Sequence, residues 1–234
     1  MKFLKIFWKK GVNLMLKVQV KTLLFLLFLF LSIFALACEN DTRTTNNTTP
    51  NPNATPSDKV DDEVAILETD VGRIVIEFFP NEAPKHVENF KKLSKEGFYD
   101  GLAFHRIIPG VIIQGGDPNS KSGPPETWEM GQPGQATVPA EFNARPHVRG
   151  IVSAARRGND INSATSQFFI CESAKPEWNG QYTVYGRVIE GMNVVGIISN
   201  SPTQPGTERP SEKITIKKVT LDKRSNFGPT PTYN

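Results

Sequence analysis

Short runs in which apolar and polar residues alternate fill the middle of the chain, and such runs predict β-strands with one buried face. Two of them, 64–69 and 73–79, flank Asp70-Val71-Gly72 and predict a hairpin. The stretch 104–117 holds two more apolar runs on either side of Pro109-Gly110, which predicts strand, turn and strand. The remaining predicted strands are 148–155, 166–171, 182–189 and 213–221.

Two other stretches carry helical spacing. The first begins at Pro84, a residue suited to the first turn of a helix, and ends near Gly97. The second is short and follows Gly191. Their apolar positions are Val87, Phe90 and Leu93 in the first stretch and Met192, Val195 and Ile198 in the second. About eight strands with these helices predict a mainly β domain built as an antiparallel barrel.

The first part of the chain has the composition of a targeting segment. The apolar run 23–37 follows Lys17 and Lys21 and ends in small residues, which describes a secretory signal peptide over residues 1–37. The sequence Ala35-Leu36-Ala37-Cys38 resembles a bacterial lipoprotein box, which implies that Cys38 is lipidated after cleavage. An uncleaved signal anchor is the alternative. Both interpretations predict an extracytoplasmic domain held at a bacterial membrane.

The rest of the chain divides by composition. Residues 38–61 are rich in Thr, Asn and Pro and have few large apolar residues, which predicts a flexible linker. Residues 62–222 are long enough to bury a substantial core without disulfides or metals, and we interpret them as one domain. Residues 223–234 contain two prolines and little to bury, which predicts a disordered tail.

The formal net charge of +3 belongs to the signal segment. Residues 1–37 carry six lysines and no acidic residue, so the remaining 21 of 27 basic residues are outnumbered by 24 acidic ones. This distribution gives no reason to expect nucleic-acid binding. His86, His105 and His147 lack metal-ligand spacing, so we expect no metal and no cofactor. Cys171 lies in an apolar run and is expected to be a buried structural thiol.

The stretch 104–117 holds the most unusual polar residues of the chain. Arg106 and Gln114 lie inside apolar strands, and a buried guanidinium costs several kcal/mol unless a partner compensates it. Strand alternation predicts that Phe104 and Arg106 share one face, and that Gln114 lies on the matching face of the next strand. The two polar side chains are then expected to meet on a binding surface that is partly apolar.

This stretch, with its Phe104-His105-Arg106 start and its Gly115-Gly116-Asp117 end, resembles a signature of the cyclophilin-type peptidyl-prolyl isomerases. The segments 150–156 and 162–170 resemble the family's second signature, and the likeness extends over roughly 64–221. The resemblance implies a closed eight-stranded antiparallel β-barrel capped by two α-helices, with the ligand on its outer face. It also implies a monomer that needs no cofactor and acts on proline-containing polypeptides.

The resemblance assigns roles to individual residues. Arg106 matches the catalytic arginine, which stabilises the twisted amide, and Gln114 and Gln167 match polar contacts to the substrate. Phe169 is expected to form the floor of the proline pocket, with its neighbour Phe168 pointing into the core. The other matched pocket positions are Val111, Ile112, Ala155, Arg156 and Tyr182.

Some matched positions depart from the family pattern. Val111 and Ile112 replace Phe and Met, Tyr182 stands where many members have His, and the tryptophan used in cyclosporin binding falls opposite Glu177. The last difference predicts weak cyclosporin sensitivity. We therefore expect either a membrane-tethered prolyl isomerase acting on unfolded or exported chains, or a non-catalytic lipoprotein on the same fold that binds proline peptides or mediates surface interactions.

Overall fold

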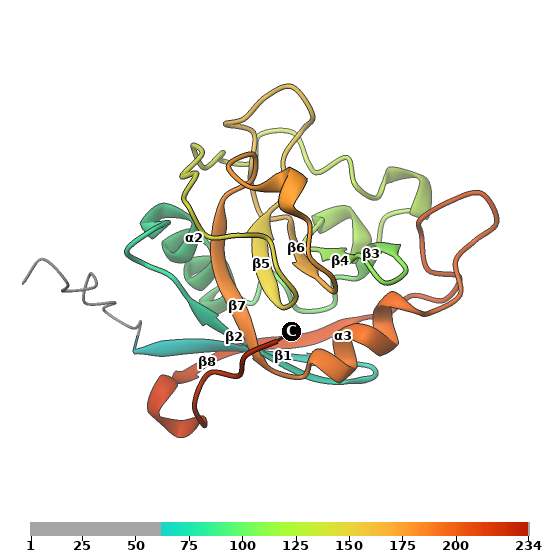
Figure 1. Cartoon of the computed structure of the whole chain (residues 1–234). Coiled ribbons are helices and arrows are strands. Elements are labelled where there is room, and N and C mark those ends of the chain that lie inside the picture. The colour runs from blue at the N-terminus through green and yellow to red at the C-terminus, as the bar shows by residue number, and fades with distance from the viewer. Residues whose placement is uncertain (1–61, 234) are drawn as a thin grey trace, which may run out of the picture. The chain divides into compact units, whose positions relative to one another are not determined.

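The computed structural model describes residues 62–233 (Figure 1). Its strands and helices fall where the hydrophobic pattern predicts them, with ends that differ by a few residues. Strand β5 begins at Ile151 rather than 148, since Gly150 has a φ of 85° and turns the chain just before it. The elements are β1 (Glu63–Thr69), β2 (Gly72–Phe78), α2 (Pro84–Lys95), β3 (Phe104–Ile108), β4 (Ile112–Gly115), β5 (Ile151–Ala154), β6 (Phe168–Cys171), β7 (Val184–Glu190), α3 (Met192–Ser199) and β8 (Ile216–Lys223).

The eight strands form one antiparallel sheet in the order β3-β4-β6-β5-β7-β2-β1-β8, which curls into a half-barrel (Figure 1). The prediction of a closed barrel is wrong, because the edge strands β3 and β8 form no ladder with each other. They adjoin where each strand begins, at an isolated bridge between Ala103 and Thr215. The N–H of Ile216 donates to the carbonyl of Leu102 at 2.7 Å on one side of this bridge. The N–H of Phe104 donates to the carbonyl of Ile214 at 3.0 Å beside this bridge. The edges therefore touch at one end and stay open along the strands.

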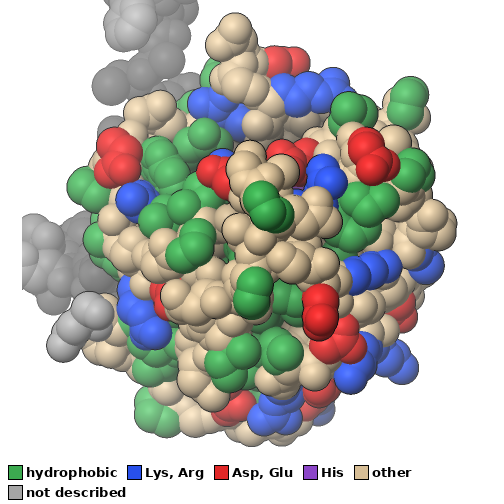
Figure 2. Space-filling view, turned by 90° about the vertical axis from the view of Figure 1, so that its right-hand side faces the viewer, with side chains coloured by type: hydrophobic (Ala, Val, Ile, Leu, Met, Phe, Trp, Pro, Cys, Tyr) green, Lys and Arg blue, Asp and Glu red, His purple; other side chains and the backbone are tan. Residues whose placement is uncertain are grey.

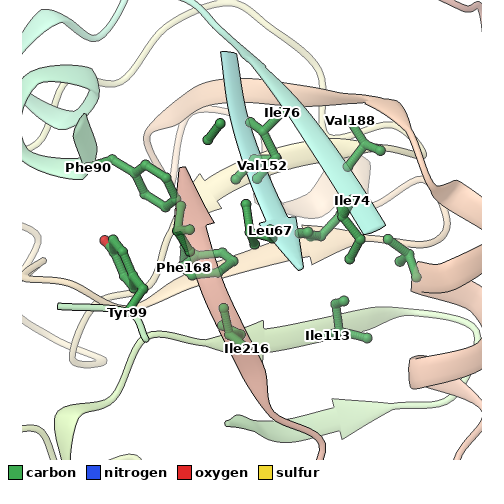
Figure 3. Packing of buried hydrophobic residues seen from close by; sticks show 14 of the residues in the cluster. Leu67, Ile74, Ile76, Phe90, Tyr99, Ile113, Val152, Phe168, Val188 and Ile216 are labelled. Atoms are coloured by element: carbon green, nitrogen blue, oxygen red, sulfur yellow. The ribbon is translucent and has the colours of Figure 1, made fainter. Parts of the chain in front are cut away.

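The inner face of the curled sheet holds the main core (Figure 3). Phe90 of α2 packs on this core, with its ring 4.7 Å from that of Tyr99 and 5.6 Å from that of Phe168. Burying an aromatic or large aliphatic side chain contributes about 1.5–3 kcal/mol. The inner cluster includes Leu67, Ile74, Ile76, Phe90, Tyr99, Ile113, Val152, Phe168, Val188 and Ile216.

A second cluster covers the outer face of strands β4, β5 and β6. Neighbouring residues of β6 alternate between the clusters, so Phe168 lies in the inner one and its neighbour Phe169 in the outer one. The prediction for this pair is confirmed. Because these strands are buried on both faces, their backbones are held rigidly, and so are the side chains that they present on the outer side. The outer cluster contains Phe79, Ile112, Ile151, Phe169, Cys171 and Val184, with Ile108, Val111, Ala155, Trp178 and Tyr182 packed against it.

The C-terminal residues 224–233, for which the sequence predicted disorder, make specific contacts with the sheet. Arg224 donates from Nε to the buried Glu77 carboxylate at 2.5 Å, and the Thr230 hydroxyl donates to the same group at 3.1 Å. The Tyr233 ring packs against the inner cluster beside Gly150. The correction has a physical reason, because a buried carboxylate requires partners and this segment supplies them.

Residues 1–61 lie outside the described part of the chain, and with them the predicted signal peptide, the linker and Cys38. Within residues 62–233, no helix has the length and apolar character needed to cross a membrane. In the same part of the chain, Cys171 is a free and fully buried thiol, as the sequence predicted.

Candidate functional site

The site lies on the outer face of the sheet, where β3 and β4 pair. Arg106 lies directly opposite Gln114 in this pairing, so the two polar side chains share the outer face as predicted. Phe104 does not join them. A register shift between Phe104 and Arg106 places Phe104 opposite Gly115, and its side chain is fully buried in the inner cluster. The predicted shared face is wrong for Phe104, because a β-bulge reverses the alternation.

Three hydrogen bonds connect the polar side chains in a row. Arg106 donates from Nη1 to Oε1 of Gln114 at 3.1 Å, and Gln114 donates from Nε2 to Oε1 of Gln167 at 3.0 Å. Gln167 in turn donates to the fully buried carboxylate of Asp117 at 3.0 Å. We call Arg106, Gln114, Gln167 and Asp117 the polar chain. It fixes which way both amides point, because each carbonyl oxygen accepts from the previous member.

Aromatic rings form the apolar side of the site. Phe169 lies opposite Gln114 on the neighbouring strand and is 4% exposed. Trp178 and Tyr182 stand edge-on to it, with ring centroids 5.5 Å and 5.4 Å away. The ring of His147 stacks on Phe169 from 6.1 Å. Phe169 is thus held on several sides and presents one rigid apolar surface.

A pocket of about 320 Å³ lies between the polar chain and the aromatic rings, large enough for a small peptide segment. Most residues predicted from the sequence line it: Arg106, Ile112, Gln114, Ala155, Arg156, Gln167, Phe169 and Tyr182. Val111 is the exception, since it packs against the outer cluster and is not part of the pocket lining. The rest of the lining is Glu129, Met130, Gly131, Arg157, Ser163, Thr165 and Trp178.

Trp178 is the most informative residue that sequence reasoning missed. The short 3-10 helix Pro176–Trp178 turns its ring into the pocket, one position after Glu177. A tryptophan therefore does line this wall of the pocket, and weak cyclosporin sensitivity stays a prediction. The local signal was present as a tryptophan one residue away from the expected position, and only the turn geometry decides which residue faces the pocket.

The loop after β4 supplies a second missed group. Glu129 has a φ of 78°, in the left-handed region, and its carbonyl oxygen accepts from Nε2 of Gln167 at 3.1 Å. Burial raises the pKa of the Glu129 carboxyl, and the nearby Arg106 charge opposes this shift. No local pattern marks Glu129, because its position depends on how a long loop folds back over the sheet.

Cations outnumber carboxylates around the pocket, with Arg106, Arg156 and Arg157 facing Glu129. Arg156 lies over the ring of Tyr182, with its Cζ 4.8 Å from the centroid, and donates from Nε to the Gln181 carbonyl at 3.1 Å. These contacts hold Arg156 at the rim.

We examined the pocket region for a reactive thiol and for clusters of metal-binding side chains. Burial raises the pKa of the Cys171 thiol to about 12, so this thiol stays protonated. Residues 62–233 contain no cluster of three or more His, Cys, Asp or Glu that could hold a metal ion. The arrangement instead offers a fixed cation, aligned amides and an apolar wall.

Comparisons with known proteins agree with this geometry. The family model described as "Cyclophilin type peptidyl-prolyl cis-trans isomerase/CLD" matches residues 64–221. A peptidyl-prolyl cis-trans isomerase of Synechococcus elongatus is 44% identical over 138 residues, which cover 58% of this chain and 88% of the relative. The peptidyl-prolyl cis-trans isomerase-like 2 of Gibberella zeae is 41% identical over 158 residues, or 67% of this chain, which spans only 26% of that relative.

A comparison with solved structures also finds a cyclophilin. The cyclophilin type peptidyl-prolyl cis-trans isomerase of Cryptosporidium parvum, crystallised in the presence of the dipeptide Ala-Pro, matches with a TM-score of 0.60 and 30% identity. The match covers 69% of this chain and 99% of the other. The curled sheet, the two signature segments and the family match lead to one conclusion: this chain belongs to the cyclophilin-type peptidyl-prolyl cis-trans isomerase family.

Proposed function

We propose that this domain accelerates rotation about Xaa-Pro bonds, with Arg106 as the catalytic residue. Rotation breaks the partial double bond of the amide and meets a barrier of about 20 kcal/mol. At the twisted geometry the prolyl nitrogen becomes pyramidal and gains a lone pair. A fixed cationic donor stabilises this state more than either planar state, and that difference lowers the barrier.

The observation that carries the proposal is the position of the Arg106 guanidinium. It is anchored to Gln114 at 3.1 Å and lines a pocket whose other side is the Phe169 ring. A prolyl ring packed on Phe169 would bring its nitrogen to the polar side of the pocket. An arginine remains charged at any physiological pH, so the donor is always available.

The other residues bind and orient the substrate in this proposal. Ile112, Ala155 and Tyr182 extend the apolar surface around the prolyl ring, while Gln114 and Gln167 offer amide groups to the peptide backbone. Arg156 contributes a further donor at the rim. These contacts involve no covalent step, which suits a rotation that leaves every σ-bond of the substrate intact.

We further propose that the clients are unfolded or newly exported polypeptides, and that a lipid on Cys38 holds the domain at a membrane outside the cytoplasm. The support is the N-terminal sequence, with its apolar run and Ala35-Leu36-Ala37-Cys38 ending. Fatty-acid labelling of cells expressing the full chain tests the anchor. Label that persists in Cys38→Ala would contradict it.

The catalytic role is tested with the full chain in a protease-coupled isomerisation assay on a proline-containing peptide. Arg106→Ala should lower kcat/KM by about 10²-fold, the usual effect of removing one transition-state donor. Arg73→Ala is the matched control, because Arg73 is exposed, pairs with Glu190 and lies outside the pocket. Equal rates for Arg106→Ala and wild type would refute the catalytic assignment. Retained peptide binding with no isomerisation in wild type would instead support a binding module.

A further inference from the structure

A loop far along the chain reaches the proposed catalytic arginine. The segment between α3 and β8 extends on the right-hand side of Figure 1, in orange-red, and contacts β3 at two adjacent points. The N–H of Ile107 donates to the backbone carbonyl of Glu208 at 2.7 Å. The Glu208 carboxylate accepts from Nε of Arg106 at 2.5 Å. Backbone and side chain of Glu208 are therefore both attached to β3.

The loop itself is held by its own hydrogen bonds. Gln204 and Arg209 are joined across the turn by a 2.9 Å bond from N–H to carbonyl, and an isolated bridge pairs Thr203 with Pro210. The Arg209 guanidinium also lies 5.8 Å from the ring of Trp128, in the loop that follows β4. Such a braced turn presents Glu208 in one position.

The Glu208 contact selects which donors of Arg106 face the pocket. A guanidinium has five N–H donors in a planar fork. Nε is used by Glu208 and one donor of Nη1 by Gln114, on opposite sides of the fork. In the described part of the chain, the remaining donors have no hydrogen-bond partner, and Arg106 lines the pocket. Two acceptors on opposite sides fix the plane of the guanidinium, since one alone would let it rotate.

The pair is partly exposed, at 29% for Arg106 and 48% for Glu208. Figure 2 shows this side of the molecule, where acidic and basic side chains are interspersed with small hydrophobic groups. The orientation of the Arg106 guanidinium therefore depends on its individual partners, Glu208 and Gln114.

We propose that Glu208 is a positioning residue for Arg106, which orients the guanidinium toward the substrate without touching the substrate itself. This inference rests on the proposed catalytic role of Arg106. Orientation of a catalytic group contributes to rate because a misplacement of about 1 Å costs up to 10²-fold. Loss of Glu208 should therefore lower the rate of the chemical step more than it weakens substrate binding.

The test compares Glu208→Ala and Glu208→Gln in the full chain. Glu208→Ala should lower kcat by about tenfold and leave KM within about twofold, because the donor is still present but no longer aligned. Glu208→Gln should keep at least about half of the wild-type kcat, because its amide oxygen accepts the same hydrogen bond. The matched control is Glu212→Ala, an exposed acidic residue of the same loop, which should behave as wild type.

A second readout is independent of activity. The Nε–Hε signal of Arg106 in ¹⁵N NMR spectra, identified by its absence in Arg106→Ala, should be protected from exchange in wild type and Glu208→Gln. It should broaden or vanish in Glu208→Ala. If Glu208→Ala does not fold, Glu208→Ser replaces it, since serine is too short to reach the guanidinium.

The outcomes separate this inference from the function on which it rests. Wild-type activity in Arg106→Ala would overturn both. Activity lost in Arg106→Ala but unchanged in Glu208→Ala would overturn the positioning role alone, as would an unchanged Nε–Hε signal. An equal loss in Glu212→Ala would also overturn it, because that would reveal a general effect of the loop.

Discussion

Single residues carry much of the chemistry of this domain, and Arg106 shows how. A cation in an apolar strand costs free energy, and here Glu208 and Gln114 offset that cost on two sides of the guanidinium. The sequence made Arg106 conspicuous because a charge interrupts an apolar run. It could not reveal Glu208, which lies 102 residues away in the chain. The sequence around a position gives the type of residue there, but it does not show which distant residues contact that residue in the fold.

His105 leads to a prediction about pH. Its ring is fully buried, and neither ring nitrogen has a hydrogen-bond partner in the described part of the chain. This burial lowers the pKa of His105 to about 4, although the nearby Asp117 carboxylate opposes the shift. The unfolded chain, with a histidine pKa of about 6.5, then binds a proton more readily than the folded one. The contribution of neutral His105 to the free energy of unfolding is therefore fully present above a pH of about 6.5. It is lost as the pH falls toward about 4, by about 3 kcal/mol in total.

Urea unfolding at pH 7 and pH 5 measures this effect. Burial also lowers the pKa values of His86 and His147, so both add to the loss at pH 5 in the same direction. His105→Leu removes one titrating group and should lose about 2 kcal/mol less than wild type between these pH values. An identical loss in His105→Leu and wild type would show that His105 does not titrate as described.

At the scale of elements, alternation and turn residues predicted the strands and both helices. The predictions failed where the orientation of a side chain depends on how one element packs or pairs with another. The bulge beside Arg106 turns Phe104 inward, and nothing in the residues 104–108 marks it. The 3-10 helix Pro176–Trp178 likewise decides that Trp178, rather than Glu177, faces the pocket. Both features arise from register against a neighbouring strand or surface, which a single strand's sequence does not contain.

Gly116 gives a prediction about how β4 and the segment before β6 fit together. Its φ is 90°, and a Cβ placed there would lie 2.4 Å from the carbonyl oxygen of Ser166 and 3.1 Å from Cα of Gln167. Gly116→Ala should therefore push Gln167 away from Gln114 and break the polar chain. We expect a loss of stability of about 2–3 kcal/mol and a lower kcat/KM.

The matched control is Gly110→Ala, since Gly110 also has a positive φ of 70° but has open space around a new Cβ. This variant pays only the backbone strain, about 1–2 kcal/mol, and should keep wild-type activity. Denaturant midpoints and the isomerisation assay measure both effects. Equal behaviour of the two variants would mean that the close contact at Gly116 is unimportant.

At the scale of the whole domain, the C-terminal segment is tied to the sheet through Glu77. This carboxylate is 4% exposed and accepts from Arg187 at 2.8 Å and from Arg224 at 2.5 Å. Burial by itself would raise the pKa of Glu77, but the hydrogen bonds and charges of Arg224 and Arg187 outweigh burial and lower it. The folded state therefore holds the charged form more strongly than the unfolded chain does.

Glu77→Gln tests this connection. A charged hydrogen-bond network of this kind should contribute about 2 kcal/mol at pH 7, and urea unfolding of the variant measures its loss. Because the folded pKa is lowered, the contribution is present above the ordinary glutamate pKa of about 4.3 and disappears as the pH falls further. Glu190→Gln, at an exposed ion pair with Arg73, should cost less than about 1 kcal/mol. An equal cost for both variants would contradict the role given to Glu77.

The sequence by itself determined the mainly β class, the positions of the strands and helices, and the pairing of Arg106 with Gln114 on one face. It could do so because alternation, turn residues and a charge in an apolar run are all local properties. Only the tertiary structure decided that the sheet stays open between β3 and β8, that Trp178 and Glu129 join the pocket, and that residues 224–233 are ordered. Each of these depends on contacts between segments far apart in the chain, where packing and the pairing of buried charges select the arrangement.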